Sequence, residues 1–279
     1  MDEIDEIEQL DADLLLWETE VETGVRSLNE AVLSEVDGFL DGRAGSFLGP
    51  KTTSADWSDN MRAVTYFNAG LTAMIYRVGF LSLLSGLVER IKESARRMDA
   101  YYAKIQPGYQ SATYATVVNQ LTEQTRALVA TAAEQTYGKL VGESLMLGTL
   151  TKSTGAELRR TIREKLKNEG LAVRPLSTNA SESLYISSRA YMQSVAENER
   201  MKYYYYMGTA VAGSRSFCLS KKGKAFTQAE VESWPNQTWA GKIPGTNKQS
   251  IFWYCGGYRC RDRLLPISKT MYKTLKANE

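Results

Sequence analysis

Residues 64–88 are the stretch that most constrains the fold, because they are largely apolar and carry one charged side chain, Arg77. A segment of about 20 apolar residues is long enough to span a bilayer. Asn68, Arg77, three glycines and several hydroxyl groups make these residues a poor membrane span. The sequence therefore predicts a helix that is buried against neighbouring helices or subunits, with no membrane partner.

The helical pattern extends beyond this stretch. It runs over residues 61–104, is broken by Pro107-Gly108, and continues over residues 114–147. Two long helices joined by a short break favour an antiparallel hairpin, which we assign to residues 61–150. Connecting helices are expected in residues 151–200.

Within these connecting helices, two short signals mark the expected ends. Gly170 has the position of a C-terminal cap for the first helix, which we expect over residues 156–169. After Pro175, residues 177–179 contain Ser, Thr and Asn, which are favoured at helix N-caps. A second helix is therefore expected to begin there and to end near Arg200.

Residues 1–41 are strongly acidic: they contain fourteen Asp or Glu and a single basic side chain, Arg26, although the whole chain has a formal net charge of +2. Apolar residues recur in them at steps of three and four, as in an amphipathic helix that docks on a partner surface. A solvated acidic helix face is the alternative. The apolar positions are Ile4, Ile7, Leu10, Leu14, Leu15, Trp17, Val21, Val25 and Leu28.

The composition of residues 42–60, which include Gly42, Gly45 and Gly49-Pro50, predicts a linker. Nothing in the sequence resembles a signal peptide, so synthesis in the cytoplasm is expected.

Residues 201–268 depart from the helical pattern and contain all three cysteines. The aromatic and β-branched run 202–211 favours a strand, and Thr227 with Glu230 has the spacing of a capping box for a short helix. Glycines and Pro244 make residues 241–247 an irregular loop. We predict a mainly α protein with a long helical hairpin and a small, loop-rich, cysteine-containing α+β module at 201–268, followed by a C-terminal tail, 269–279.

Four short segments of this module resemble a known family. They are Phe217-Cys218, Gly223-Lys224 before Phe226-Thr227, Cys-Gly-Gly-Tyr-Arg-Cys-Arg at 255–261 and Leu-Leu-Pro-Ile at 264–267. They are similar to the C-terminal module of Mu F-like head morphogenesis proteins, the minor head (minor capsid) proteins of tailed bacteriophages. The helices before the module also resemble that family, so the likeness covers about residues 150–268.

The resemblance implies a structural protein of the virion, present in few copies, associated with the portal and the inner head, and active in head assembly by binding. Its expected partners are the portal protein, the major capsid or scaffolding protein and packaged DNA. It would be oligomeric within the virion, at the head or head–tail junction, after assembly in the host cytoplasm. The alternatives are a neck or adaptor component that joins portal to tail, and a DNA-binding accessory factor or nuclease carried in the head.

Two sets of residues are candidates for these roles. The first set is expected to maintain the module and comprises Cys218, Gly223, Lys224, Gly256, Gly257, Cys260 and Arg261. The second set is basic and could contact DNA phosphates or an acidic partner; it comprises Arg159, Arg160, Arg163, Lys221, Lys222, Arg259 and Arg263. For the helix that carries Arg159, a solvated face paired to Glu157 and Glu164 is the alternative.

The sequence contains no histidine, which excludes Ser-His-Asp and Cys-His catalysis and zinc sites built on imidazole. It also has no glycine-rich phosphate-binding loop or dinucleotide fingerprint. We therefore expect binding rather than enzymatic turnover.

Three interpretations of the cysteines remain open. Cys218, Cys255 and Cys260 could bind a structural zinc ion, with Asp262 as the fourth ligand at the place where family members often carry histidine. Two of the cysteines could instead form a disulfide once the virion leaves the reducing cytoplasm. They could also be buried free thiols, packed beneath Trp253 and Tyr258.

Overall fold

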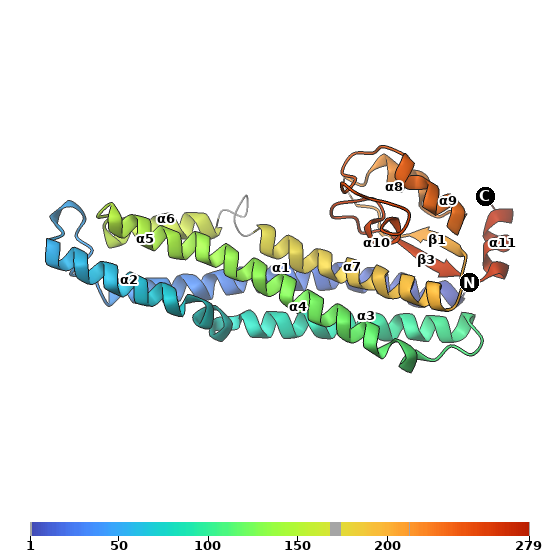
Figure 1. The fold of residues 1–279 in the computed structure, drawn as a ribbon, viewed down its shortest axis with the longest axis horizontal. Helices are drawn as coiled ribbons and strands as arrows, with labels where there is room; N and C mark the ends of the chain where they lie inside the picture. Colours follow the sequence, from blue (N-terminus) through green and yellow to red (C-terminus); the bar gives the residue numbers. More distant parts are fainter. Residues whose placement is uncertain (1, 168–173, 212, 279) are drawn as a thin grey trace. The chain divides into compact units, whose positions relative to one another are not determined.

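The protein is described by a computed structural model covering residues 2–167, 174–211 and 213–278 (Figure 1). Most of these residues are helical, and the strands lie in the last third of the chain. The prediction of a mainly α protein with a small C-terminal α+β module is confirmed. The helices are α1 (Asp2–Asp41), α2 (Ser54–Ile75), α3 (Leu81–Ile105), α4 (Ala115–Tyr137), α5 (Glu143–Leu150), α6 (Gly155–Lys167), α7 (Arg174–Asn198), α8 (Ser216–Lys221), α9 (Gln228–Ser233), α10 (Ile251–Tyr254) and α11 (Lys269–Ala277).

The chain forms two compact units that are interleaved along the sequence. The cysteine unit comprises Met1–Glu18, Val88–Gln124 and Glu182–Glu279, and the helical unit comprises Thr19–Leu87 and Thr125–Ser181. The long helices α1, α3, α4 and α7 contribute to both. A helix of about 20 residues already spans a small domain, so the two parts of a longer helix can pack into different cores. The sequence analysis divided the chain into consecutive segments, whereas each unit of the structure combines separate stretches of the chain.

In the helical unit, α2 begins at Ser54 and not at Met61, so the predicted linker is shorter than 42–60. Thr53 is the N-cap: its hydroxyl accepts a hydrogen bond from the Asp56 backbone N–H at 3.1 Å, and the Asp56 carboxylate accepts one from the Thr53 N–H at 3.3 Å. This reciprocal pair satisfies two backbone donors of the first turn. The helix therefore begins inside a stretch whose composition resembled a loop.

The outer parts of the two arms of the predicted hairpin pack against each other in this unit. The Trp57 indole donates a hydrogen bond to the Thr149 carbonyl at 3.1 Å, and the Asn68 amide donates one to the Gly142 carbonyl at 3.1 Å. As the residue number rises along α2 from 57 to 68, the residue number of its partner falls from 149 to 142, so the two segments run antiparallel. A π-helical turn, η4 (Gly138–Gly142), joins α4 to α5 there.

Another π-helical turn, η2 (Tyr76–Phe80), separates α2 from α3, and Gly79 within it has a φ of 145°. Across this turn, residues Ser54–Ile105 contain an 18-residue window of mean hydropathy 1.6, long and apolar enough to cross a membrane, of which 39% is buried within the protein. Core helices of soluble proteins have the same property.

The apolar stripe of α1 is buried within the chain itself. Its buried members in the cysteine unit are Ile7, Leu10, Leu14 and Trp17, and those in the helical unit are Val21, Val25 and Leu28. Leu15 is half-buried. The expectation that this stripe docks on a separate partner is therefore wrong, because the chain's own helices already cover it. The side chain of Ile4 lies outside the described residues.

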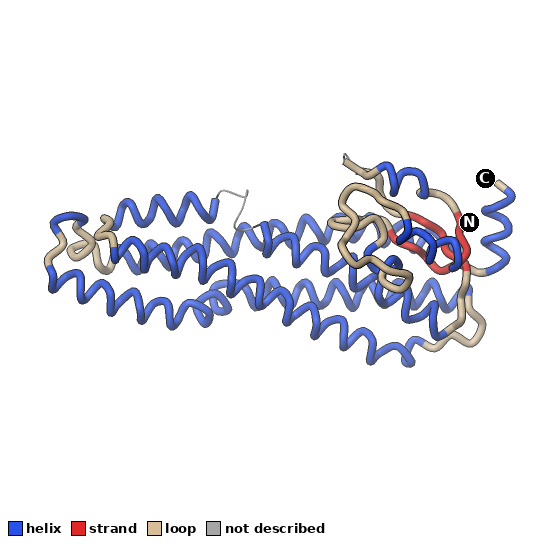
Figure 2. Tube along the Cα trace, turned by 45° about the horizontal axis from the view of Figure 1, so that its top comes forward, coloured by secondary structure: helices blue, strands red, loops and turns tan. Residues whose placement is uncertain are grey.

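The cysteine unit contains one antiparallel sheet of β1 (Tyr203–Met207), β2 (Ala225–Thr227) and β3 (Arg263–Ile267), in the order β2-β1-β3. Figure 2 shows these strands in red, side by side. In the register, Tyr203 faces both Thr227 and Ile267. The strand ends at Met207 rather than Val211, because Gly208 follows it with a φ of 148°.

Two other boundaries differ from the prediction. Residues 269–277 form α11 instead of a tail, with Ser268 as N-cap and the Tyr272 ring stacked on Tyr203 at 4.5 Å. Helix α7 begins at Arg174, ahead of the predicted cap at residues 177–179, because Pro175 fits the first helical turn, where no intrahelical N–H bond is needed. The predicted cap at Gly170 lies outside the described residues.

Candidate metal centre

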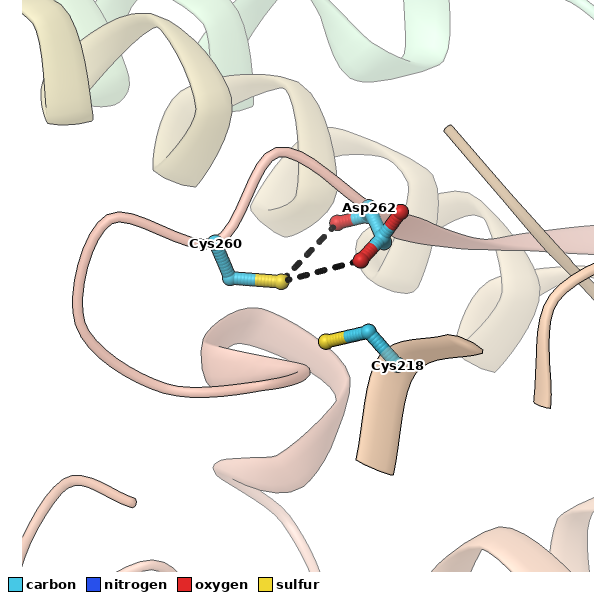
Figure 3. A group of neighbouring side chains, drawn as sticks. All are labelled: Cys218, Cys260 and Asp262. Carbon is cyan, nitrogen blue, oxygen red and sulfur yellow. Dashed lines mark hydrogen bonds between the residues drawn. The ribbon is translucent and has the colours of Figure 1, made fainter. Parts of the chain in front are cut away.

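Three predicted site residues from two separate segments meet in the cysteine unit. Cys218 lies on α8, and Cys260 and Asp262 lie on the loop that leads into β3. One ligand atom from each of the three, two thiol sulfurs and a carboxylate oxygen, lies within 4.8 Å of the others, and all three residues are buried. Figure 3 shows both sulfurs and the carboxylate turned toward one another. We refer to these residues as the Cys-Cys-Asp cluster.

The cluster is tightly packed. Cys260 Sγ lies 3.7 Å from Asp262 Oδ2 and 3.9 Å from the Asp262 carbonyl oxygen (Figure 3). The Gly256 backbone N–H donates a hydrogen bond to Cys260 Sγ at 3.2 Å. On the other side, the Tyr206 hydroxyl donates one to Asp262 Oδ2 at 3.5 Å. Both polar ends of the cluster are therefore held by groups of the same unit.

Two glycines provide the space for this packing. A Cβ on Gly256 would lie 2.3 Å from Cys218 Sγ and 3.0 Å from Cys260 Sγ. A Cβ on Gly208 would lie 2.6 Å from Asp262 Oδ1, and its φ of 148° also disfavours other residues. Gly256 was predicted to maintain the module, and what it contributes is the absence of a side chain. Gly257 and Gly223 do have positive φ values, 101° and 76°.

The two thiols of the cluster differ in acidity. The pKa of Cys260 is lowered to about 7, first because Cys218 donates a hydrogen bond to it and also because the Arg189 guanidinium is near, although burial opposes the shift. The pKa of Cys218 is raised by the same hydrogen bond and by burial. Cys260 therefore ionises more readily than Cys218, and the thiolate is the form of cysteine that binds metals.

Arg189 is a site residue that the sequence analysis missed. This buried side chain of α7 donates hydrogen bonds to the Trp253 carbonyl at 2.7 Å and to the Cys260 carbonyl. It thus fixes both ends of the loop that carries Cys260. The sequence feature that could have revealed it is a basic residue among apolar positions of a predicted helix, namely Leu184, Tyr185, Met192 and Val195.

Cys255 does not belong to this cluster. Among the residues that the structure describes, the group of close ligand atoms contains Cys218, Cys260 and Asp262 alone. Cys255 is buried with its Sγ 3.7 Å from the Phe252 carbonyl, and burial raises its pKa. The predicted four-residue set is therefore reduced to three. All three cysteines are free and buried.

A cavity of about 280 Å³ adjoins the cluster. Its lining includes Cys218, Cys260 and Asp262 together with Arg215, Arg259 and Arg261. This cavity leaves room for water or a small ligand beside the cluster.

Arg261, which was predicted to maintain the module, is paired with Glu18 of α1. The guanidinium donates two hydrogen bonds to the Glu18 carboxylate, both at 2.7 Å, and the Tyr185 hydroxyl donates a third at 3.0 Å. A bidentate pair of this kind has a defined geometry. It joins α1 and α7 to the loop of the module, a connection that no local sequence pattern indicated.

Arg263 was predicted to contact DNA or a partner, and the structure contradicts this. Its side chain is 2% exposed and forms an ion pair with Asp11 of α1. Burial lowers the pKa of Arg263 to about 9, so the guanidinium remains charged at pH 7. Residue Arg263 follows Asp262 directly into the sheet, which turns its side chain into the core.

The lysines of the module have local contacts. The Lys221 ammonium lies 4.3 Å from the centre of the Phe217 ring and 4.7 Å from that of Trp234, and burial lowers its pKa. The Lys224 ammonium donates to the Ser220 carbonyl at 2.8 Å. The Lys222 ammonium is buried, so it is not presented to a partner. Arg259 is exposed and stays a candidate for contact.

In the helical unit, the basic side chains of α6 are matched by acidic side chains of α1. Arg159 forms ion pairs with Asp37 and Asp41, and Arg163 forms one with Asp37 at 3.0 Å. Arg160 is exposed. Neither a DNA-contacting face nor a solvated face with intrahelical partners describes Arg159 and Arg163, because their acidic partners come from another helix of the same chain.

Comparisons with protein-family models, with curated protein sequences and with solved structures find no match for this chain.

Proposed function

We propose that this protein is a structural component of a tailed-phage virion, a portal-associated minor head protein that acts in head assembly by binding. The observation that carries the proposal is the burial of the residues on which the family resemblance rests. Cys218, Gly256 and Cys260 meet in one buried cluster, and Arg261 ties their loop to α1. Residues that maintain a fold in this way suit a module whose task is attachment.

A second feature of the helical unit supports binding to other subunits. The exposed positions between residues 64 and 88 carry no charge apart from Arg77, which pairs with Glu35 at 3.1 Å. They include Tyr66 and Leu81, with 84% and 55% of their surface exposed. An exposed face that lacks charge and presents large apolar side chains suits an interaction site. We call these exposed positions the uncharged face.

The test is a cryo-EM map of the particle that contains this chain, scored for the position and copy number of its density. The expected result is density of a few copies at the portal or just inside the head. Density as a ring in the neck would replace the proposal with an adaptor between portal and tail. Absence from the particle would overturn the structural role and favour an assembly factor or a DNA-binding protein.

A pair of variants tests the uncharged face in the same particles. Thr72 and Thr161 are both exposed helical threonines of the helical unit, but only Thr72 belongs to the uncharged face. We expect Thr72→Glu to lower the copy number in particles and Thr161→Glu to leave it unchanged. Equal incorporation of both variants would exclude the uncharged face as an attachment surface.

A further inference from the structure

We propose that Cys218, Cys260 and Asp262 bind one Zn²⁺ ion, whose fourth ligand is a water molecule on the side of the adjoining cavity. This inference is independent of the virion role. It differs from the pattern expected from sequence, in which Cys255 completed a closed four-residue site.

The donor atoms select the metal. Two thiolate sulfurs and one carboxylate oxygen are ligands that zinc accepts, whereas Mg²⁺ and Ca²⁺ require mainly oxygen ligands. Iron–sulfur clusters are held by four cysteine thiolates, and this cluster provides two. Zinc is therefore the divalent ion that these residues suit best.

The separations between the donors agree with tetrahedral coordination. Zinc lies about 2.3 Å from sulfur and about 2.1 Å from a carboxylate oxygen, which places a sulfur and an oxygen ligand about 3.6 Å apart at the tetrahedral angle. The observed separation of Cys260 Sγ and Asp262 Oδ2 is 3.7 Å. Small side-chain adjustments bring Cys218 Sγ, which lies within 4.8 Å of both, to the same spacing.

Neighbouring groups form hydrogen bonds to the three proposed ligands, as they do around known metal sites. Metal ligands are usually oriented by hydrogen bonds from neighbouring groups. Here the Gly256 N–H contacts Cys260 Sγ at 3.2 Å and the Tyr206 hydroxyl contacts Asp262 Oδ2 at 3.5 Å. Gly208 and Gly256 have no side chain, so the space beside the three donor groups stays free.

Charge balance gives a further reason. Two thiolates and one carboxylate would bury three negative charges, and buried charges require compensation. Arg189, which is 4% exposed and donates to the Cys260 carbonyl, supplies one positive charge. A divalent cation supplies the remaining two, so the buried group becomes neutral overall.

The open fourth position follows from the residue set and the cavity. Three protein ligands leave tetrahedral zinc with one position for water. The cluster residues are part of the lining of the cavity of about 280 Å³, which provides room for that water. Cys255 is directed to the Phe252 carbonyl instead.

The experiment measures zinc in the full-length protein, purified under reducing conditions with zinc in the growth medium, by inductively coupled plasma mass spectrometry. Wild-type protein is expected to contain one zinc per chain. Cys260→Ser and Asp262→Asn are expected to weaken zinc binding about 100-fold or more, because even outer contacts of a metal site contribute 10- to 100-fold. Cys255→Ser is the matched control, a buried cysteine of the same loop, and is expected to keep its zinc.

Cobalt substitution counts the thiolates without relying on the stability of a variant. The near-ultraviolet charge-transfer absorption of bound Co²⁺ scales with the number of thiolate ligands, so Cys218→Ser should halve it and Cys255→Ser should not change it. Three results would overturn the proposal: wild-type protein without zinc, equal zinc loss in Cys255→Ser and Cys260→Ser, or a Cys218–Cys260 disulfide in the reduced preparation. None of them bears on the position of the protein in the particle.

Discussion

At the scale of single residues, the stability of the module depends on how closely the backbone approaches the cysteine sulfur atoms. Gly256 is the clearest case, because an added Cβ would lie 2.3 Å from Cys218 Sγ. We expect Gly256→Ala to lower the free energy of unfolding by about 1–3 kcal/mol, the usual effect of overpacking. Urea denaturation followed by circular dichroism measures it.

The control for this change is Gly38→Ala in α1, where no atom lies within 4 Å of the added Cβ. Alanine is favoured over glycine within a helix by about 1 kcal/mol, so this variant should be as stable as the wild type or more stable. Equal destabilisation by both variants would contradict the packing explanation.

The buried ion pair of Arg263 with Asp11 is the second residue-scale case. Arg263→Ala leaves a carboxylate unpaired in a mostly buried position and should lower the free energy of unfolding by about 3–5 kcal/mol. Replacing both residues by apolar ones, Arg263→Met with Asp11→Leu, should be much less destabilising. A double-mutant cycle in urea measures the coupling, and additive effects would show that the pair contributes little.

At the scale of elements, tyrosines join the C-terminal ends of α3 and α7. The hydroxyls of Tyr109 and Tyr191 both donate to Asp99, and Tyr114 donates to Glu199 at 2.7 Å. The Tyr109 and Tyr114 rings are stacked at 5.4 Å. Burial, then the hydrogen bond to Glu199, raises the pKa of Tyr114 to about 12, and burial raises those of Tyr109 and Tyr191.

These shifts predict a loss of stability in alkali. A tyrosine has a pKa of about 10 in the unfolded chain, so above that pH the unfolded state releases protons that the folded state keeps. The stabilisation is complete below pH 10 and is lost as the pH rises from 10 toward 12. Urea midpoints measured from pH 8 to 11.5 should fall, and they should fall less steeply in Tyr114→Phe. An unchanged slope in that variant would contradict the assignment.

The element boundaries show what local patterns could and could not predict. The capping box at Thr227 and Glu230 was recognised and is present, and α3 ends before Pro107 as predicted. The equivalent box at Thr53 and Asp56 was overlooked because glycine, proline and threonine around it resemble a loop. The π-helical turn at Tyr76–Phe80 has no local signature beyond Gly79, since its geometry depends on the packing of two helices.

At the scale of the whole molecule, acidic α1 neutralises basic α6 within the helical unit. Asp37 and Asp41 hold Arg159 and Arg163, which reduces the charge available for DNA. We expect the double variant Asp37→Asn/Asp41→Asn to release both arginines. The plot of log K for DNA binding against log of salt concentration should then steepen by about 2, because each additional phosphate contact contributes about 0.9.

Fluorescence anisotropy with a short duplex, titrated at several salt concentrations, measures this slope. The charge-matched control is Glu22→Gln/Glu30→Gln on the same helix. If the control steepens the slope equally, the effect comes from net charge and not from the released arginines.

The sequence by itself determined the mainly α fold class, the hairpin, the course of α1 and the presence of a small cysteine-containing module. These features depend on periodicity and on turn residues, which are local properties. The membership of the cluster was predicted in part: Cys218, Cys260 and Asp262 were named, but Cys255 was added and Arg189 was missed.

Only the tertiary structure decided which charged groups are paired and which cysteines meet. Asp11 with Arg263 and Glu18 with Arg261 are separated by more than two hundred residues, and no spacing rule relates such positions. From the sequence, Arg159 likewise resembled a solvated or DNA-facing residue, but in the structure it pairs with Asp37 and Asp41 of α1. Burial and long-range contact determine these roles, because the energy of a charge depends on what surrounds it and not on its neighbours in the chain.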